Sequence, residues 1–150
     1  MKKGHELVHE IQQTAAVFGR NKECNVVFEA DGKDNTTAMT DGKTILLPAL
    51  PDNLEFSHEE TMVMRGFLDH EAGHVRHTDF TQVQAFGETQ SQQAFTIGNC
   101  LEDMRLEKLV MEEYPGSRKN FTKLRENVGE KELEYIKANP QDFTTITAAA

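Results

Sequence analysis

The sequence has few cysteines, no long apolar run and no excess of basic residues. Its two cysteines, Cys24 and Cys100, form no C-x-x-C pair, so we expect both to be reduced and packed. No apolar stretch is long enough for a membrane span, and residues 1–6 do not lead into a signal peptide, which predicts a cytoplasmic protein. The formal charge of −9 argues against nucleic acid or an anionic membrane as the main partner.

The length of 150 residues suits one domain over residues 1–150, with residues 140–150 as a flexible tail. Apolar residues at helical spacing predict a first helix from Gly4 to Phe18, and Cys24 to Glu29 is typical of a strand. Two further strands, Thr36–Thr40 and Thr44–Leu47, flank the turn signal Asp41-Gly42 and predict a hairpin. Pro48 and Pro51 follow, which suggests that the second of these strands lies at a sheet edge.

The rest of the chain reads as helices. A capping box at Ser57-His58-Glu59-Glu60 predicts a helix that runs to about His77. A similar box at Thr89-Gln90-Ser91-Gln92 predicts a helix to about Glu113, and a last helix covers Lys119 to Asn139 with a break near Gly129. The expected class is therefore α+β: mostly helical, with a small antiparallel sheet or hairpin packed on the second helix and on the acidic helix that follows.

The second helix carries the motif H-E-x-x-H at His70, Glu71 and His74. Histidines at i and i+4 lie on one helical face, where both imidazoles can bind one Zn²⁺. Glu71 lies beside the first histidine and is the candidate general base toward a metal-bound water. The motif thus predicts a zinc site with a catalytic carboxylate.

A catalytic zinc usually has a third protein ligand. The extension H-E-x-x-H-x-x-G-x-x-H fails, because its last two fixed positions hold His77 and Phe80. An acidic residue on the next helix is the other common solution. Asp103 falls on the apolar arc of that helix, whereas Glu102 falls on the opposite half. A carboxylate on the apolar arc needs a partner, and a metal ion can be that partner. Asp103 is our first choice, and Glu102 stays as the alternate.

Glu107 lies one turn beyond Asp103, where it can accept the second N–H of a ligand histidine. A plainer interpretation is also open for this helix. Glu102, Asp103 and Glu107 would then form an exposed charge network with Arg105, without any metal.

The combination of an HExxH helix with a later acidic helix resembles the gluzincin-type zinc metallopeptidases. The sequences of the segments 40–51, 70–80, 101–107 and 114–118 are more similar to the N-terminal metallopeptidase-like domain of phage and bacterial proteins labelled cobaltochelatase T-subunit-like. Proteins of that group generally carry a C-terminal von Willebrand A-type domain, on which the chelatase label depends. Because this sequence stops at Ala150, we do not carry that label over at this point.

These observations predict a zinc-dependent peptidase that hydrolyses a peptide bond with zinc-activated water. Its partner would be a peptide or protein substrate, added as a strand beside Thr44, Ile45 and Leu46. Two alternatives stay open: a non-catalytic, zinc-stabilised binding module of a larger phage or bacterial assembly with a partner protein, and a helical interaction domain without metal.

Overall fold

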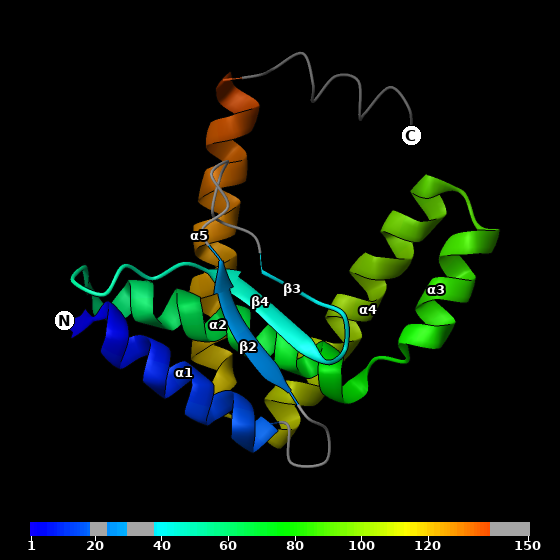
Figure 1. Ribbon diagram of the computed structural model, residues 1–150. Coiled ribbons are helices and arrows are strands. Elements are labelled where there is room, and N and C mark those ends of the chain that lie inside the picture. Colours follow the sequence, from blue (N-terminus) through cyan, green and yellow to red (C-terminus); the bar gives the residue numbers. More distant parts are fainter. Residues whose placement is uncertain (19–23, 30–37, 139–150) are drawn as a thin grey trace.

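The computed structural model describes residues 1–18, 24–29 and 38–138 (Figure 1). The α+β class, mostly helical, is confirmed. In chain order the elements are β1 (Lys2–Lys3), α1 (Gly4–Phe18), β2 (Asn25–Glu29), β3 (Met39–Thr40), β4 (Thr44–Pro48), β5 (Glu55–Phe56), α2 (His58–His77), α3 (Phe80–Thr89), α4 (Gln92–Glu113) and α5 (Ser117–Ala138). Within these ranges, no helix is both long and apolar enough to cross a membrane. The tail predicted at 140–150 lies outside the described residues.

Helix α2 is the centre of the fold and packs against α1, the sheet, α4 and α5. Its start is the expected capping box: Ser57 Oγ accepts from the Glu60 N–H at 3.2 Å, and Glu60 Oε2 accepts from the Ser57 N–H at 2.7 Å. The backbone leaves the helix at Thr78, which is extended and donates its N–H to the His74 carbonyl. Both ends of α2 are therefore fixed by local hydrogen bonds.

Two glycines let other helices cross close to α2. A Cβ on Gly66 would lie 2.8 Å from the Asn120 carbonyl oxygen of α5. A Cβ on Gly73 would lie 2.8 Å from side-chain atoms of Leu106 and Val110 of α4. Since Gly73 sits inside the HExxH motif, its missing side chain brings α4 directly against the two histidines.

Fully buried apolar side chains from every layer form one core around α2. They come from α1, the sheet, α2, α4 and α5: Leu7, Ile11, Ile45, Leu68, Leu106, Val110 and Phe121. Burial of such side chains is the main stabilising term, at about 1.5–3 kcal/mol for each one. This core holds the histidine face of α2 in place against α4.

The three-stranded sheet has the order β2-β4-β3; it contains the expected antiparallel hairpin, β3 and β4, but as a whole it is mixed rather than antiparallel. Strand β4 pairs in parallel with β2 over Asn25–Glu29 and antiparallel with β3 at Met39 and Thr40. The expectation that this strand lies at a sheet edge is wrong, because it is the central strand. The two prolines signalled only that the strand ends, since Pro48 is its last residue.

Several helix boundaries also differ. The segment after Thr78 is a further helix, α3, whose N-cap is Asp79, and sequence analysis missed it. Helix α4 is capped by Ser91 rather than Thr89, and α5 continues through Gly129 without a break. Cys24 is half-buried, which raises the pKa of its thiol, whereas Cys100 is exposed instead of packed.

Candidate metal centre

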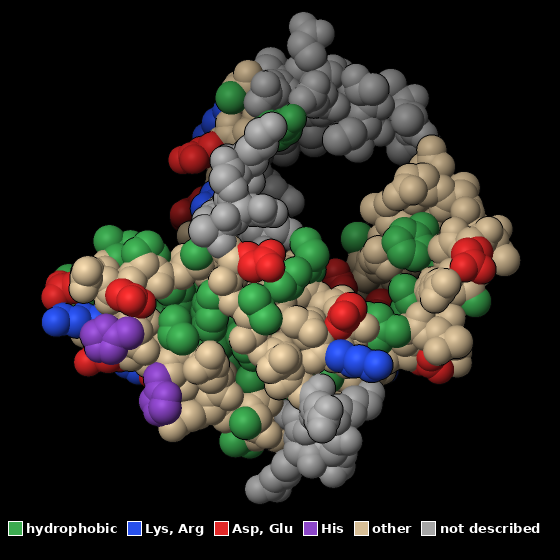
Figure 2. Space-filling model, in the orientation of Figure 1, with side chains coloured by type: hydrophobic (Ala, Val, Ile, Leu, Met, Phe, Trp, Pro, Cys, Tyr) green, Lys and Arg blue, Asp and Glu red, His purple; other side chains and the backbone are tan. Residues whose placement is uncertain are grey.

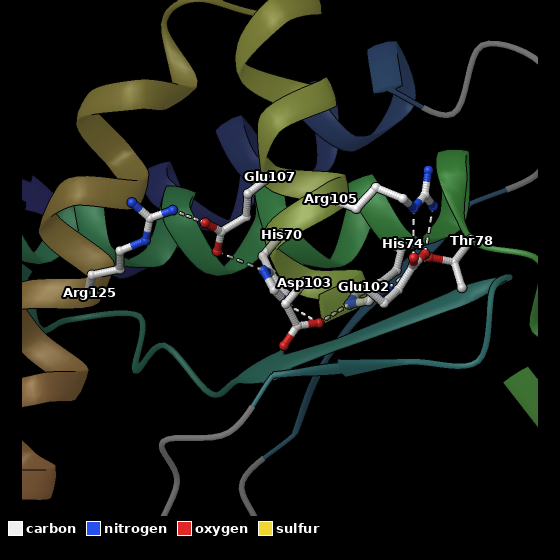
Figure 3. A network of polar contacts seen from close by, with 8 residues as sticks. All are labelled: His70, His74, Thr78, Glu102, Asp103, Arg105, Glu107 and Arg125. Atoms are coloured by element: carbon white, nitrogen blue, oxygen red, sulfur yellow. Dashed lines mark hydrogen bonds and ion pairs between the residues drawn. The ribbon is translucent and has the colours of Figure 1, made fainter. Parts of the chain in front are cut away.

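Three side chains from two helices converge at the crossing of α2 and α4 (Figure 3). Asp103 Oδ1 lies 3.2 Å from His74 Nε2 and 3.7 Å from His70 Nε2. One ligand atom from each of the three residues lies within 4.8 Å of the others. In a tetrahedral zinc site with bonds of about 2.0 Å, ligand atoms lie about 3.3 Å apart. The spacing therefore fits one ion with two imidazoles, one carboxylate and an open fourth position.

A carboxylate contacts the Nδ1 of His70, while its Nε2 is the ring nitrogen nearer Asp103. Its Nδ1 lies 3.3 Å from Glu107 Oε1, and Glu107 forms an ion pair with Arg125 of α5. Burial opposes a charge on His70, but Glu107, Glu71 and Asp103 outweigh it and raise the pKa of the imidazole. A carboxylate can only accept, so Nδ1 is the protonated nitrogen and Nε2 is left to bind a metal.

His74 is held by a hydroxyl that is itself held by a carboxylate. Its Nδ1 lies 3.0 Å from Thr78 Oγ1, and Thr78 donates its hydroxyl to Glu102 Oε1 at 2.6 Å. Arg105 donates to both oxygens of Glu102, which lowers the pKa of that carboxyl to about 2. Because the Thr78 hydrogen goes to Glu102, its oxygen accepts from His74 Nδ1–H. His74 Nε2 is thus also free to bind a metal.

The structure brings Asp103, our first choice, to the two histidines, and it turns the alternate Glu102 to Thr78 and Arg105. The reasoning behind that choice holds only in part. Met104 and Leu106 are among the residues that define the apolar arc of α4: Leu106 is fully buried, but Met104 is 70 % exposed, and the Asp103 side chain itself is 42 % exposed. Asp103 faces α2 because it lies one turn before Leu106 and two before Val110, which dock on Gly73.

The plainer interpretation of the acidic helix, an exposed charge network, holds for one pair. Glu102 and Arg105 form an i,i+3 ion pair. Asp103 and Glu107, in contrast, point at His70 and His74 rather than at basic residues of their own helix. Thr78 was missed by sequence analysis, although its place one turn after His74 is a usable signal.

Glu71, the expected general base, is buried in the fold. It is 7 % exposed, and this burial raises the pKa of its carboxyl while His70 and His74 oppose the rise. Thr44, Ile45 and Leu46, in contrast, lie in the central strand, and Ile45 is fully buried. They are not available for strand addition, so the predicted substrate strand is wrong.

A comparison with protein-family models gives one match, to the family described as cobalamin biosynthesis protein CobT, over residues 6–149. The chain belongs to the CobT family. The match spans α1 to α5 and includes every residue of the metal centre. Neither curated proteins nor solved structures give a match.

The CobT match corrects the expected function. Peptide hydrolysis is wrong, and with it the classification as a metallopeptidase or hydrolase and the expected peptide or protein substrate, because CobT proteins serve cobalamin biosynthesis. The match does not favour the alternative of a zinc-stabilised module in a phage or bacterial assembly either.

Proposed function

We propose that this chain is a subunit of a cobaltochelatase-type enzyme that works with partner proteins, and that it holds one Zn²⁺ between His70, His74 and Asp103. The family match supports the first part, because it covers residues 6–149 and concerns cobalamin biosynthesis. The second part rests on one observation: each histidine has its Nδ1 occupied by a protein acceptor, Glu107 or Thr78, and turns its Nε2 toward Asp103.

The donor set supports a borderline divalent metal. Imidazole suits zinc and other first-row transition metals, whereas a site for Mg²⁺ or Ca²⁺ would offer mainly oxygens. Co²⁺ accepts the same donors, but three protein ligands with an open fourth position are the usual setting of Zn²⁺. We therefore propose Zn²⁺ as the resident ion, and we treat Co²⁺ at these residues as a useful probe rather than as the enzyme's cargo.

The arrangement also suggests what the bound ion contributes. Its ligands come from α2 and α4, so the ion would hold these two helices together at Gly73. When bound, Zn²⁺ supplies an electrophilic centre for a donor atom at the fourth position. Asp103 is partly exposed, which leaves that position accessible to a partner or substrate. Glu71 is the nearby carboxylate to which we assign proton acceptance.

Metal analysis of the purified chain tests the zinc part of the proposal. We expect one Zn²⁺ per chain, lost in His74→Ala and kept in Glu71→Gln, since Glu71 is not a ligand in this scheme. His9→Ala is the matched control, because His9 is an exposed histidine of α1 that is hydrogen-bonded to the Gln13 side chain. Absence of zinc after chelator-free purification, together with no uptake of added Zn²⁺, rejects the site.

Reconstitution tests the chelatase part. The chain is added to the other subunits of a cobaltochelatase, and cobalt entry into a metal-free corrin is followed by visible absorption. Support of cobalt insertion by the wild type, and loss of it in His74→Ala, is the expected result. If the wild-type chain binds zinc but never supports insertion, the zinc site stands and the assignment as a chelatase subunit falls.

A further inference from the structure

Helix α3 and the first half of α4 form a hairpin that stands beside the body of the molecule (Figure 1). Between Phe80 and Leu101 the sequence has a single charged residue, Glu88. None of residues 81–101 is buried. In Figure 2 this part of the surface is mostly tan and green, with little red or blue. A helical pair with so little burial and so little charge is unusual for an exposed surface.

Aromatic rings nevertheless pack against each other on the inner face of the hairpin. The rings of Phe86 and Phe95 stack with their centroids 6.4 Å apart. Glycines allow this close fit, because a Cβ on Gly98 would lie 2.8 Å from the Phe86 ring and one on Gly87 would lie 3.0 Å from the Phe95 ring. These contacts use the inner face of the hairpin and leave the outer face of α4 exposed.

The outer face of α4 carries an apolar stripe of three residues. Ile97, Leu101 and Met104 are 61 %, 61 % and 70 % exposed. At about 100° per residue they lie within a sector of about 60°, opposite the buried Leu106. The spacing i, i+4 and i+7 is the one with which a helix packs against another helix.

We propose that two copies of this chain associate through this stripe, with α4 antiparallel to α4 of the second copy. Two features favour a second copy as the occupant: the hairpin is nearly free of charge, and the spacing of the stripe is self-complementary. Each chain carries a formal charge of −9, so like charges oppose contact over most of the surface. The hairpin, with Glu88 as its only charged residue between Phe80 and Leu101, is where two copies can meet with least repulsion.

The stripe is also self-complementary about Leu101. In an antiparallel pair with Leu101 at the two-fold axis, Ile97 of each copy lies opposite Met104 of the other. Lys108, one turn further along the same sector, decides between orientations. A parallel pair would place the two Lys108 side chains together, whereas an antiparallel pair separates them by about 21 Å, at 1.5 Å per residue, beyond the Debye length of about 10 Å.

Sedimentation velocity of the full chain, over about 1–100 µM, tests this inference, which does not depend on the metal centre. We expect a concentration-dependent dimer that Leu101→Glu converts to a monomer. Leu133→Glu is the matched control, since Leu133 is a 51 % exposed leucine on α5 and its replacement should leave the dimer intact. A monomeric wild type at all concentrations, or a Leu101→Glu variant that still dimerises, overturns the proposal.

Cross-linking gives a second readout that does not depend on mass alone. Cys100 is exposed and adjoins Leu101, so in a Cys24→Ser background a short bismaleimide should join Cys100 to Cys100 of the second copy. The cross-linked dimer should disappear in Leu101→Glu, whose helical circular dichroism should match that of the wild type. Cross-linking that is equally strong in Leu101→Glu counts against association through the stripe.

Discussion

The hydroxyl oxygen of Thr78 lies 2.6 Å from Oε1 of Glu102, so the residue that ends α2 is joined to a carboxylate of α4. A threonine hydroxyl has one hydrogen, and here it is donated in a hydrogen bond to Glu102. What remains for His74 Nδ1, 3.0 Å away, is a lone pair. A carboxylate that binds no metal in this arrangement therefore still decides which nitrogen of His74 is free to bind one.

Replacement of Thr78 tests this role. In Thr78→Val the shape of the side chain is nearly kept, but the hydroxyl is lost, and we expect Zn²⁺ affinity to fall by about 10–100-fold. Thr78→Ser keeps the hydroxyl and should stay close to the wild type. Competition with a chromophoric zinc chelator measures the affinities. Nitrogen-15 shifts of the imidazole in the metal-free protein report the tautomer of His74, which should become mixed only in Thr78→Val.

Replacement of the two neighbouring acidic residues of α4, Glu102 and Asp103, should reduce Zn²⁺ affinity to different degrees. Asp103→Ala removes a proposed ligand, while Glu102→Ala only releases Thr78 and Arg105. We expect Zn²⁺ affinity to decrease in the order wild type, Glu102→Ala, Asp103→Ala, measured by the same chelator competition. Glu112→Ala, a change at an exposed residue of the same helix, is the control. An equal loss of Zn²⁺ affinity in Asp103→Ala and Glu102→Ala would contradict a direct bond from Asp103 to the ion.

Local signals in the sequence predicted local structure well. The capping box at Ser57 and the apolar spacing from Gly4 to Phe18 each depend on residues within one or two turns, and both elements begin where expected. Thr44–Pro48 was misplaced because its position depends on parallel pairing with β2, a partner that no short pattern reveals. Helix α3 was missed although Phe80, Val83 and Phe86 recur at helical spacing after the N-cap Asp79, so this signal was available in the sequence.

The residues of the candidate metal centre were predictable to a similar extent. His70 and His74 follow from spacing alone. Asp103 was found through helical periodicity, although the arc used for the argument is exposed at Met104. Thr78 was not found, because its role depends on contact with Glu102 across 24 residues of sequence.

Glu10 of α1 should make part of the stability depend on pH. Partial burial pushes its pKa upward, but Lys2 and Arg65 outweigh this and hold the pKa of the carboxyl below its ordinary value. Because the folded-state pKa is lowered, the stabilisation is present above about pH 4.5 and is lost as the pH falls through the lower folded-state value. Protonation of Glu10 thus weakens the link between β1, α1 and α2.

Urea unfolding at several pH values measures this effect in Glu10→Gln. At pH 7 we expect the variant to be less stable by on the order of 0.5 kcal/mol, since the group is partly exposed and screened by solvent. The difference from the wild type should shrink toward pH 3. Glu130→Gln, at an exposed position of α5, is the control and should show no such trend. A difference that grows on acidification would contradict the assigned direction.

Gly73 should be the most sensitive position between the two histidines, because the helix that carries Asp103 rests on it. A methyl group there would lie 2.8 Å from both Leu106 Cδ1 and Val110 Cγ2, two fully buried side chains. Overpacking of this kind costs about 1–3 kcal/mol, and the better helix propensity of alanine offsets about 1 kcal/mol of it. We expect Gly73→Ala to lose up to about 2 kcal/mol of unfolding free energy and to bind Zn²⁺ more weakly, because α4 is displaced.

The matched control for Gly73→Ala is Gly129→Ala. It makes the same change within a helix, at a position with no atom within 4 Å of the added methyl group. There the propensity term acts alone, so stability should rise by about 0.5–1 kcal/mol with unchanged Zn²⁺ affinity. Thermal unfolding and chelator competition on both variants separate the two effects. If Gly73→Ala were as stable and bound zinc as tightly as Gly129→Ala, the close approach of α4 to α2 would not be what positions Asp103.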